Sequence, residues 1–205
     1  MPALRLLSVN ARSLPLDRAA LAELIEAARP DVACVHGSPS LLRWRSISAA
    51  LARRAGLVVV SGGRTGGANL LMSSLGVDVV RTTDLRFTAA GRLRPSGAAL
   101  AVLRLRGSEF IVAAAQFAGT AAVRRRQAGE LQAAIARLVP ADPAVVISAQ
   151  GANGSSTAAW QALSENRVAI ADGIFVDGRI GIGEARELPT RAASQPVCVE
   201  LSLPD

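Results

Sequence analysis

The sequence predicts an α/β protein in which two packed mixed β-sheets are flanked by helices. Short apolar runs typical of buried strands recur along the chain, helical segments separate some of them, and tight turns join others. Such a mixture is typical of two facing sheets with helices on their outer surfaces. The 205 residues suit one domain, and half of them are hydrophobic, which is enough for a sizeable core. We therefore expect a single domain spanning residues 1–205.

The first half of the chain alternates between expected strands and helices. One helix is expected over residues 17–28, where Leu21, Leu24 and Ile25 share a face. A second is expected from Ser38, as its N-cap, to Ala55, with Pro39 in the first helical position. The expected strands are residues 4–9, 31–35, 57–60, 69–73 and 77–82.

The second half begins with an expected hairpin, residues 98–106 and 109–117, which turns at Gly107-Ser108. The longest expected helix covers residues 121–138 and ends before Pro140. A fully apolar strand at residues 144–148 leads into a polar loop and a short helix at residues 157–163. The remaining expected strands are residues 174–176, 180–182 and 197–203.

The glycine-rich segment SGGRTGGAN, residues 61–69, could be interpreted as a phosphate-binding loop. It lacks the Gly-Lys-Ser/Thr ending and precedes an expected strand instead of a helix, so it fails the structural context of that motif. We interpret it as a flexible connection.

The charge pattern is unusual, because the formal charge is +7 and every basic residue is arginine. Arginine binds phosphate well, so a polyanionic partner is one interpretation. However, the arginines are dispersed along the chain, and a lysine-free, alanine-rich composition is typical of a GC-rich bacterial genome. Aromatic residues make up only 3% and tyrosine is absent, which disfavours a base-stacking surface. Nucleic acid is therefore the less favoured partner.

The location suggested by the sequence is the cytoplasm. No apolar stretch approaches the roughly 18 residues of a membrane helix, and the N-terminus lacks the features of a signal peptide. We therefore expect no membrane partner. Cys34 and Cys198 lie in apolar, strand-like runs and are expected to be buried hydrophobic residues.

Segments along nearly the whole chain resemble, in order, those of the endonuclease/exonuclease/phosphatase family. LRLLSVN resembles the first strand of the family and ends at Asn10, while PDVACVHG resembles PDVICLQE. FIVAAAQF resembles the strand that ends in HL, and VVISAQGAN resembles the strand that leads to GDFN. DGIFV resembles DYIFV, and AASQPVCVEL resembles SDHLPVVAEL. The resemblance implies a four-layered α/β sandwich like that of DNase I.

The same alignment implies that most catalytic positions of the family are substituted. The metal-binding glutamate corresponds to Gly37, the catalytic histidine to Gln116, and the Asp-His pair to Ala193-Ser194. The aspartate of GDFN corresponds to Gln150 and its asparagine to Ala152, with Asn153 one residue further on. Magnesium prefers oxygen ligands that include a carboxylate, so we expect no metal or other cofactor and no conventional phosphodiesterase activity.

The candidate site follows from these positions. The residues expected at a catalytic centre are Asn10, His36, Gln116 and Gln150, and those expected to bind a ligand are Asn153, Asp172 and Ser194. Asn10, Gly37, Gln116, Gln150 and Ser194 should converge at one edge of the sheets. Their amides donate and accept hydrogen bonds without charge, so the cleft suits a small molecule or a phosphate-containing ligand.

Three functional interpretations remain open. The chain is a pseudoenzyme that binds a ligand, an enzyme with a repurposed metal-independent reaction, or a residual metal-dependent nuclease or phosphatase. His36, the sole histidine, is either an acid or base or a hydrogen-bonded structural residue. Cys34, two residues earlier in the same expected strand, should share its face. A Cys-His pair needs an exposed thiolate, however, and a buried cysteine is the favoured interpretation.

Overall fold

The computed structural model of the protein describes residues 1–11, 18–38, 42–88, 96–138, 144–151, 167–171, 173–189 and 195–204. The short helix expected over residues 157–163 lies outside these ranges.

Within the described ranges, the first sheet has six strands in the order β11-β12-β1-β2-β4-β3. The neighbours β1 and β2 are parallel, and the other neighbouring pairs are antiparallel. Helix α1 (Arg18–Ala28) makes the connection between the two parallel strands. The strand bounds are β1 Ala3–Asn10, β2 Val32–His36, β3 Val58–Gly63, β4 Asn69–Ser73, β11 Gly181–Glu187 and β12 Val197–Ser202.

The second sheet repeats this plan, with six described strands in the order β5-β6-β7-β8-β10-β9. Here β7 and β8 are parallel, joined through helix α3 (Ala121–Leu138), and the other neighbouring pairs are antiparallel. The strand bounds are β5 Asp78–Arg86, β6 Gly97–Leu105, β7 Ser108–Phe117, β8 Ala144–Gly151, β9 Arg167–Ala171 and β10 Ile174–Asp177.

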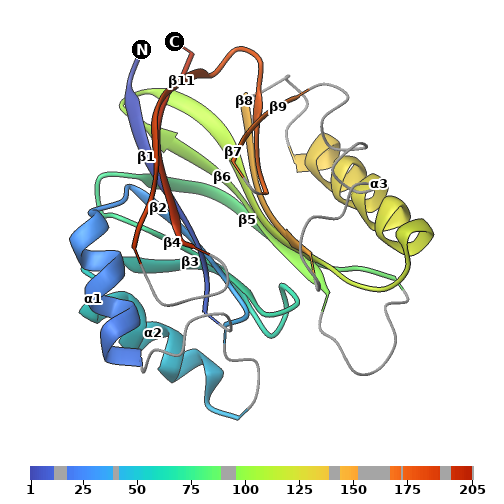
Figure 1. Ribbon diagram of the computed structural model, residues 1–205, viewed down its shortest axis with the longest axis horizontal. Helices are drawn as coiled ribbons and strands as arrows, with labels where there is room; N and C mark the ends of the chain where they lie inside the picture. The colour runs from blue at the N-terminus through green and yellow to red at the C-terminus, as the bar shows by residue number, and fades with distance from the viewer. Residues whose placement is uncertain are drawn as a thin grey trace.

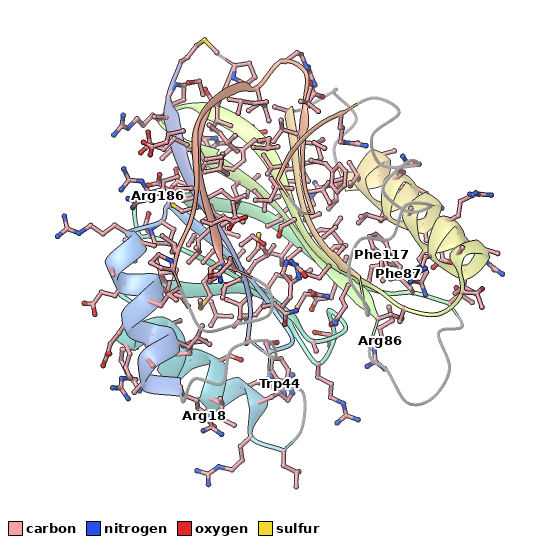
Figure 2. The ribbon with its side chains drawn as sticks, viewed as in Figure 1. Arg18, Trp44, Arg86, Phe87, Phe117 and Arg186 are labelled. Atoms are coloured by element: carbon pink, nitrogen blue, oxygen red, sulfur yellow. The ribbon has the colours of Figure 1, made fainter. Side chains whose placement is uncertain are left out.

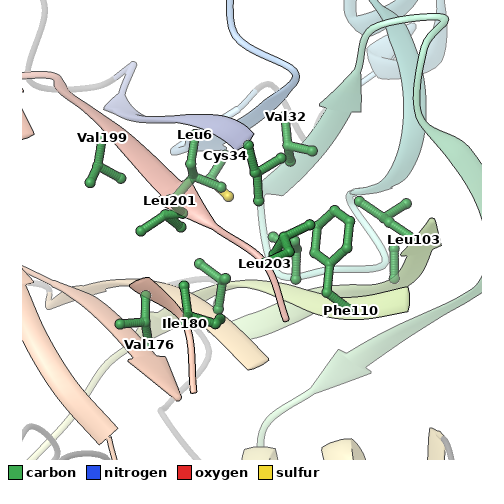
Figure 3. Packing of buried hydrophobic residues seen from close by; sticks show 14 of the residues in the cluster. Leu6, Val32, Cys34, Leu103, Phe110, Val176, Ile180, Val199, Leu201 and Leu203 are labelled. Atoms are coloured by element: carbon green, nitrogen blue, oxygen red, sulfur yellow. The ribbon is translucent and has the colours of Figure 1, made fainter. Parts of the chain in front are cut away.

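The two sheets face each other, with α1 and α2 (Trp44–Arg54) outside the first and α3 outside the second (Figure 1). Alternation along the strands supplies three buried layers. Residues such as Leu6, Phe110 and Leu201 fill the space between the sheets (Figure 3). Ile25 and Leu131 belong to the outer layers, under α1 and α3. The predicted two mixed sheets with flanking helices are confirmed.

The outer layer under α3 includes an aromatic pair. The rings of Phe87 and Phe117 stack with their centroids 5.3 Å apart and their planes 11° from parallel (Figure 2). Both rings are buried, and each buried aromatic ring contributes roughly 1.5–3 kcal/mol through apolar burial. The pair fixes the end of β5 against the end of β7, at the same end of the sheet as Gln116.

The predicted start of the second helix is wrong. Helix α2 begins at Trp44, six residues after Ser38, and its N-cap residue is Arg43, in a left-handed conformation with no side-chain cap. The amide of Ser38 instead donates to the carbonyl of Ala68, which holds the end of β2 against the β3–β4 loop. A polar residue before Pro therefore marked the end of a strand rather than the start of a helix.

The hairpin turn is displaced by one residue from its predicted position. Leu105 pairs with Ser108, so the two loop residues are Arg106 and Gly107, with φ angles of 50° and 95°. Two consecutive positive φ angles match the type I′ turn, whose twist suits that of the flanking strands.

Three edge strands were not fully predicted, because they lack a continuous buried face. Strand β11 was predicted over residues 180–182 and extends to Glu187, with all its residues exposed. Strand β5 continues to Arg86, four residues beyond its predicted end, and nearly all its residues are exposed. Strand β9 was not predicted at all. At an edge, backbone pairing with one neighbour forms the strand, so an apolar pattern is not required.

The glycine-rich segment packs closely instead of forming an open connection. A Cβ at Gly67 would lie 2.5 Å from the backbone nitrogen of Gly97, and one at Gly97 would lie 2.4 Å from the carbonyl oxygen of Leu85. A Cβ at Gly63 would collide with the ring of Trp44. The glycines therefore allow the β3–β4 loop to lie against the start of β6 in the other sheet. In the described part of the chain, no helix is both long and apolar enough to cross a membrane.

Candidate functional site

At one end of both sheets, the facing sides carry polar side chains instead of apolar ones. In the first sheet Asn10, His36 and Asn69 lie side by side on β1, β2 and β4. In the second, Gln116 and Gln150 are paired in register on β7 and β8. Each lies two residues from a residue on the inner face, so side-chain alternation directs all of them between the sheets. We call Ser8, Asn10, His36, Asn69, Gln116, Ser148 and Gln150 the polar end layer.

His36 links the two sheets within this layer. Its Nδ1 lies 2.8 Å from Asn69 Oδ1, and its Nε2 lies 2.8 Å from Ser148 Oγ on the opposite sheet. Ser148 Oγ is also hydrogen-bonded, at 2.8 Å, to Ser8 Oγ of β1. The imidazole is fully buried, and both of its nitrogens have partners.

Asn69 fixes the tautomer of this imidazole in its neutral form. Its amide nitrogen donates to the carbonyls of Gly66 and Gly97, at 2.8 and 3.0 Å, so its Oδ1 must face His36 as an acceptor. The proton of neutral His36 is therefore on Nδ1, and Nε2 accepts from Ser148. Burial lowers the His36 pKa from 6.5 to about 4, although the Asn69 hydrogen bond opposes this shift. The ring is neutral at physiological pH.

Gln116 and Gln150 make fewer hydrogen bonds to the described residues than the histidine does. Gln116 retains 8% of its accessible surface, yet its buried Oε1 has no hydrogen-bond partner among the described residues. Gln150 is half-buried, and no described residue hydrogen-bonds its side chain. A buried amide oxygen without a partner lowers the free energy of unfolding by roughly 1–3 kcal/mol. Such an oxygen is therefore a candidate acceptor for a bound ligand.

The described residues do not fit the magnesium centre that the family resemblance implies. Magnesium prefers oxygen ligands that include a carboxylate. The polar end layer contains amides, hydroxyls and one neutral imidazole, and Gly37, directly after β2 with a φ of 68°, has no side chain. Among the described residues, no group of three or more His, Cys, Asp or Glu could hold a metal ion.

The other predicted ligand-binding residues, Asn153, Asp172 and Ser194, lie outside the described residues. Of the five positions predicted to converge, Asn10, Gly37, Gln116 and Gln150 lie at the same end of the facing sheets. The catalytic and ligand-binding roles assigned to these residues stay predictions.

Sequence reasoning did not single out Ser8, Asn69 or Ser148, which complete the polar end layer. The available signal was a polar residue at an inward position of an apolar strand, as in LLSVN and VVIS. A buried polar side chain requires a partner, so several such positions at the ends of strands indicate a shared network.

Cys34 is not a partner for His36 in catalysis. It is fully buried between the sheets, and burial raises its pKa to about 12, although a Ser148 hydrogen bond opposes the shift. A protonated, inaccessible thiol is inert. The favoured interpretation of a buried hydrophobic cysteine agrees with this environment.

A surface pocket of about 180 Å³ lies elsewhere on the first sheet, over β1, β11 and β12. It is lined by Arg5, Glu184, Arg186, Cys198 and Glu200, and Arg5 forms an ion pair with Glu200 at 2.6 Å. Cys198 alternates to the outer face of the sheet, under α1, so this pocket does not communicate with the polar end layer.

Comparison with solved structures identifies the class of fold. An endonuclease/exonuclease/phosphatase from Bacteroides vulgatus has a TM-score of 0.79 at 12% identity, with 100% of both chains covered. A mannosyl-6-phosphatase from Bacteroides thetaiotaomicron has a TM-score of 0.78 at 14% identity, covering 98% of this chain and 100% of that one. The human Nocturnin catalytic domain has a TM-score of 0.76 at 16% identity, covering 99% and 94%.

This chain therefore has the fold of the endonuclease/exonuclease/phosphatase proteins, as the sequence resemblance predicted. No protein-family model and no curated protein matches its sequence. At these identities the structural similarity defines the fold, and the chemistry must be argued from the residues of this chain.

Proposed function

We propose that the protein binds a small ligand, neutral or phosphate-containing, at the polar end layer without a metal ion, and that it has lost the magnesium-dependent phosphodiesterase centre. The observation that carries this proposal is the neutral character of the layer. Amides and hydroxyls occupy positions where the family resemblance expects carboxylates and a catalytic histidine. The buried amide oxygen of Gln116 is suited to recognition, because it can accept a hydrogen bond that no described residue donates.

Two of the structural neighbours agree with a phosphate-bearing ligand in this proposal. One is named a mannosyl-6-phosphatase, and another was determined with a bound sulfate anion. The cytoplasmic location expected from the sequence belongs to this proposal as well.

A role for His36 as a general acid or base is the less favoured form of the proposal. Acid–base catalysis is most efficient when the pKa lies near the working pH and a proton can reach the substrate. The ring has a pKa of about 4, is buried, and already uses both nitrogens. In our proposal His36 holds the two sheets together.

The test combines a ligand screen with an activity assay. Purified protein in EDTA is screened for a rise in melting temperature against sugars, nucleosides and their monophosphates. We expect a stabilising ligand whose effect is unchanged by magnesium and reduced in Gln116→Ala and Gln150→Ala. A matched control, Gln132→Ala on α3, should bind normally.

The activity arm addresses the residual hydrolase. The same compounds, a chromogenic phosphodiester, DNA and RNA are incubated with magnesium or manganese. We expect no turnover above the rate without protein. Metal-dependent turnover that Asn10→Ala abolishes would refute the proposal in favour of a hydrolase, and product formation in EDTA would indicate a repurposed reaction.

A further inference from the structure

A cluster of exposed aliphatic side chains lies where the edges of the two sheets meet. Strands β3 and β5 are the last described strands of their sheets and lie against each other. The cluster comes from β3, from β5 and from the turn that leads from β4 into β5. We call it the side patch: Val58, Val59, Leu75, Val79 and Val80. It lies away from the polar end layer, because Val58 pairs with Ser73 and Asn69 is at the other end of β4.

At the side patch the apolar interior of the sandwich reaches the surface. Val58 pairs with Ser73, which alternates to the same inner face of its sheet as Leu71. Val79 pairs with Leu103, whose side chain also lies between the sheets. Both valines therefore occupy inward positions. Because no described strand continues either sheet, the four valines of the patch are 40–45% exposed.

Polar contacts close the gap between the two edges at one end only. Nearer the polar end layer, Asp84 of β5 accepts hydrogen bonds from the hydroxyls of Ser61 and Thr65. At the side patch the side chains are aliphatic and offer no hydrogen bond, so only another apolar surface can exclude water from them favourably. Leu75, in the turn beside the gap, is 85% exposed and is the side chain best placed to enter such a surface.

Both edge strands are irregular beside the side patch. The register shifts between Val59 and Ser61 in β3, and between Val79 and Arg81 in β5. A bulge interrupts the row of backbone groups with which an added strand would pair. A partner at this surface therefore binds through side chains instead of extending a sheet.

Charges of opposite sign border the side patch. Arg53 and Arg54 are exposed in the last turn of α2, shortly before β3, on the side of the first sheet. Asp78 is exposed at the start of β5, on the side of the second sheet. None of these three side chains has an ionic partner among the described residues. The patch is therefore positive along one border and negative along the other.

Other charges near Asp78 already have partners. Arg104, which pairs with Asp78 in register, forms an ion pair with Glu109. Arg81, further along β5, donates to the carbonyl of Leu138 at the end of α3. Asp78 is thus the charge on this border that is available to a partner.

We infer that the side patch is the contact between two copies of this chain. A two-fold axis through the patch brings the aliphatic side chains of both copies together, because such an interface uses one surface twice. The same rotation exchanges the two borders, so Arg53 and Arg54 of each copy face Asp78 of the other. The charges of the patch are therefore complementary to themselves.

The dimer should be weak and should leave the polar end layer accessible. Five aliphatic side chains and three charges on each copy make a contact at the small end of specific interfaces, so we expect dissociation at roughly micromolar concentration. The side patch is at the opposite end of β3 and β4 from Asn69, so the inference is independent of the proposed function.

Sedimentation velocity over a series of protein concentrations tests the contact. We expect an equilibrium between monomer and dimer. Leu75→Glu should weaken the dimer roughly tenfold or more, because it places a charge in an apolar contact. The matched control is Leu42→Glu, because Leu42 is 93% exposed and lies beyond the opposite end of α2 from Arg53 and Arg54. Both leucines are exposed, so the melting temperatures of the two monomers should match that of the unchanged monomer.

Charge reversal tests the two-fold arrangement. Asp78→Arg should weaken self-association, because arginines then face arginine in both halves of the contact. The double variant Arg53→Asp/Arg54→Asp should weaken it as well, because acids then face Asp78. An equal mixture of the two variants should form a heterodimer, since each border of one then faces the opposite charge on the other. A folding defect in either variant would not be repaired by mixing.

Three outcomes would overturn the inference. A protein that stays monomeric throughout the concentration series has no such contact, and binding of that monomer to phospholipid vesicles through Leu75 would assign the patch to a membrane surface. A dimer that Leu75→Glu weakens no more than Leu42→Glu uses a different surface. Charge-reversed variants that stay monomeric when mixed would rule out the pairing of Arg53 and Arg54 with Asp78.

Discussion

Burial decides whether His36 is available for chemistry. The only histidine of a chain, at the end of a strand beside an expected active site, is a natural candidate for acid–base chemistry. In the folded protein it is sealed between two sheets and bonded through both nitrogens. The folded protein requires the neutral form of this imidazole, so protonating it should lower the free energy of unfolding.

The unfolding free energy should fall as the pH is lowered from about 6.5 toward 4. The His36 pKa is about 4 in the folded protein and 6.5 ordinarily, so the unfolded chain binds the proton more readily. The stabilisation is complete above the unfolded pKa and is lost as the pH falls toward the folded one. Denaturant titrations should give a slope of up to about 1.4 kcal/mol per pH unit from this residue. The His36→Gln protein should lack this component, and an identical slope in both proteins would contradict the assignment.

Gln116 gives a second prediction at the residue scale, and it concerns stability sacrificed for binding. Replacing a buried acceptor that has no partner by an apolar side chain removes its desolvation cost. Gln116→Leu should therefore raise the unfolding free energy by roughly 1–2 kcal/mol while impairing ligand binding. The control is Gln127→Leu, because Gln127 Oε1 accepts from the amide of Ala118 and its loss should destabilise. A destabilised Gln116→Leu protein would mean that this amide has a structural partner.

At the scale of elements, the β3–β4 loop is determined by close packing against β6. Gly97 has a backbone carbonyl, that of Leu85, 2.4 Å from where its Cβ would lie. Gly97→Ala should therefore lower the unfolding free energy by roughly 1–3 kcal/mol, the usual cost of forcing extra volume into a packed region. Gly129, in the middle of α3, has open space around its missing side chain, so Gly129→Ala should stabilise by about 0.5–1 kcal/mol. Thermal and chemical unfolding of the pair would show opposite signs.

Sequence patterns predicted the elements that carry a buried face and missed those that do not. Helix α3 was placed with both ends correct, because its apolar positions repeat at the helical period. Strand β5 was cut short, because its polar second half is stabilised by pairing with β6 rather than by burial. The start of α2 was misplaced, because the contact that holds Ser38, a hydrogen bond to Ala68, joins residues thirty positions apart. The residues around Ser38 in the sequence give no information about a partner so far along the chain.

The candidate site likewise has a part that the sequence predicted and a part that it did not. The sequence resemblance located Asn10, Gln116 and Gln150, since each follows an apolar strand at a position shared with a known family. It did not reveal that His36 is bonded to Ser148, because that contact crosses between sheets over 112 positions of the chain. Which side chains face each other across the two sheets is a property of their packing and can be known only from the folded chain.

At the scale of the whole molecule, the two sheets are held together by an apolar interior that is closed at one end by polar contacts. Asn69 is the centre of those contacts, because its one amide bonds His36, the carbonyl of Gly66 and that of Gly97. It thereby connects β4, β2, the glycine-rich loop and the facing sheet.

Removing this amide should therefore loosen the end of the sandwich as a unit. Asn69→Ala leaves two buried carbonyls and the Nδ1–H of His36 without partners, so the unfolding free energy should fall by roughly 3 kcal/mol or more. Ser73, also fully buried on β4 but with an unpartnered hydroxyl, is the control, and Ser73→Ala should be nearly neutral. Hydrogen exchange should localise the effect: amides of residues 63–69 and 97–99 should lose protection in Asn69→Ala, while those of β12 should not. Uniform loss of protection would mean that Asn69 supports the whole core instead of one end of it.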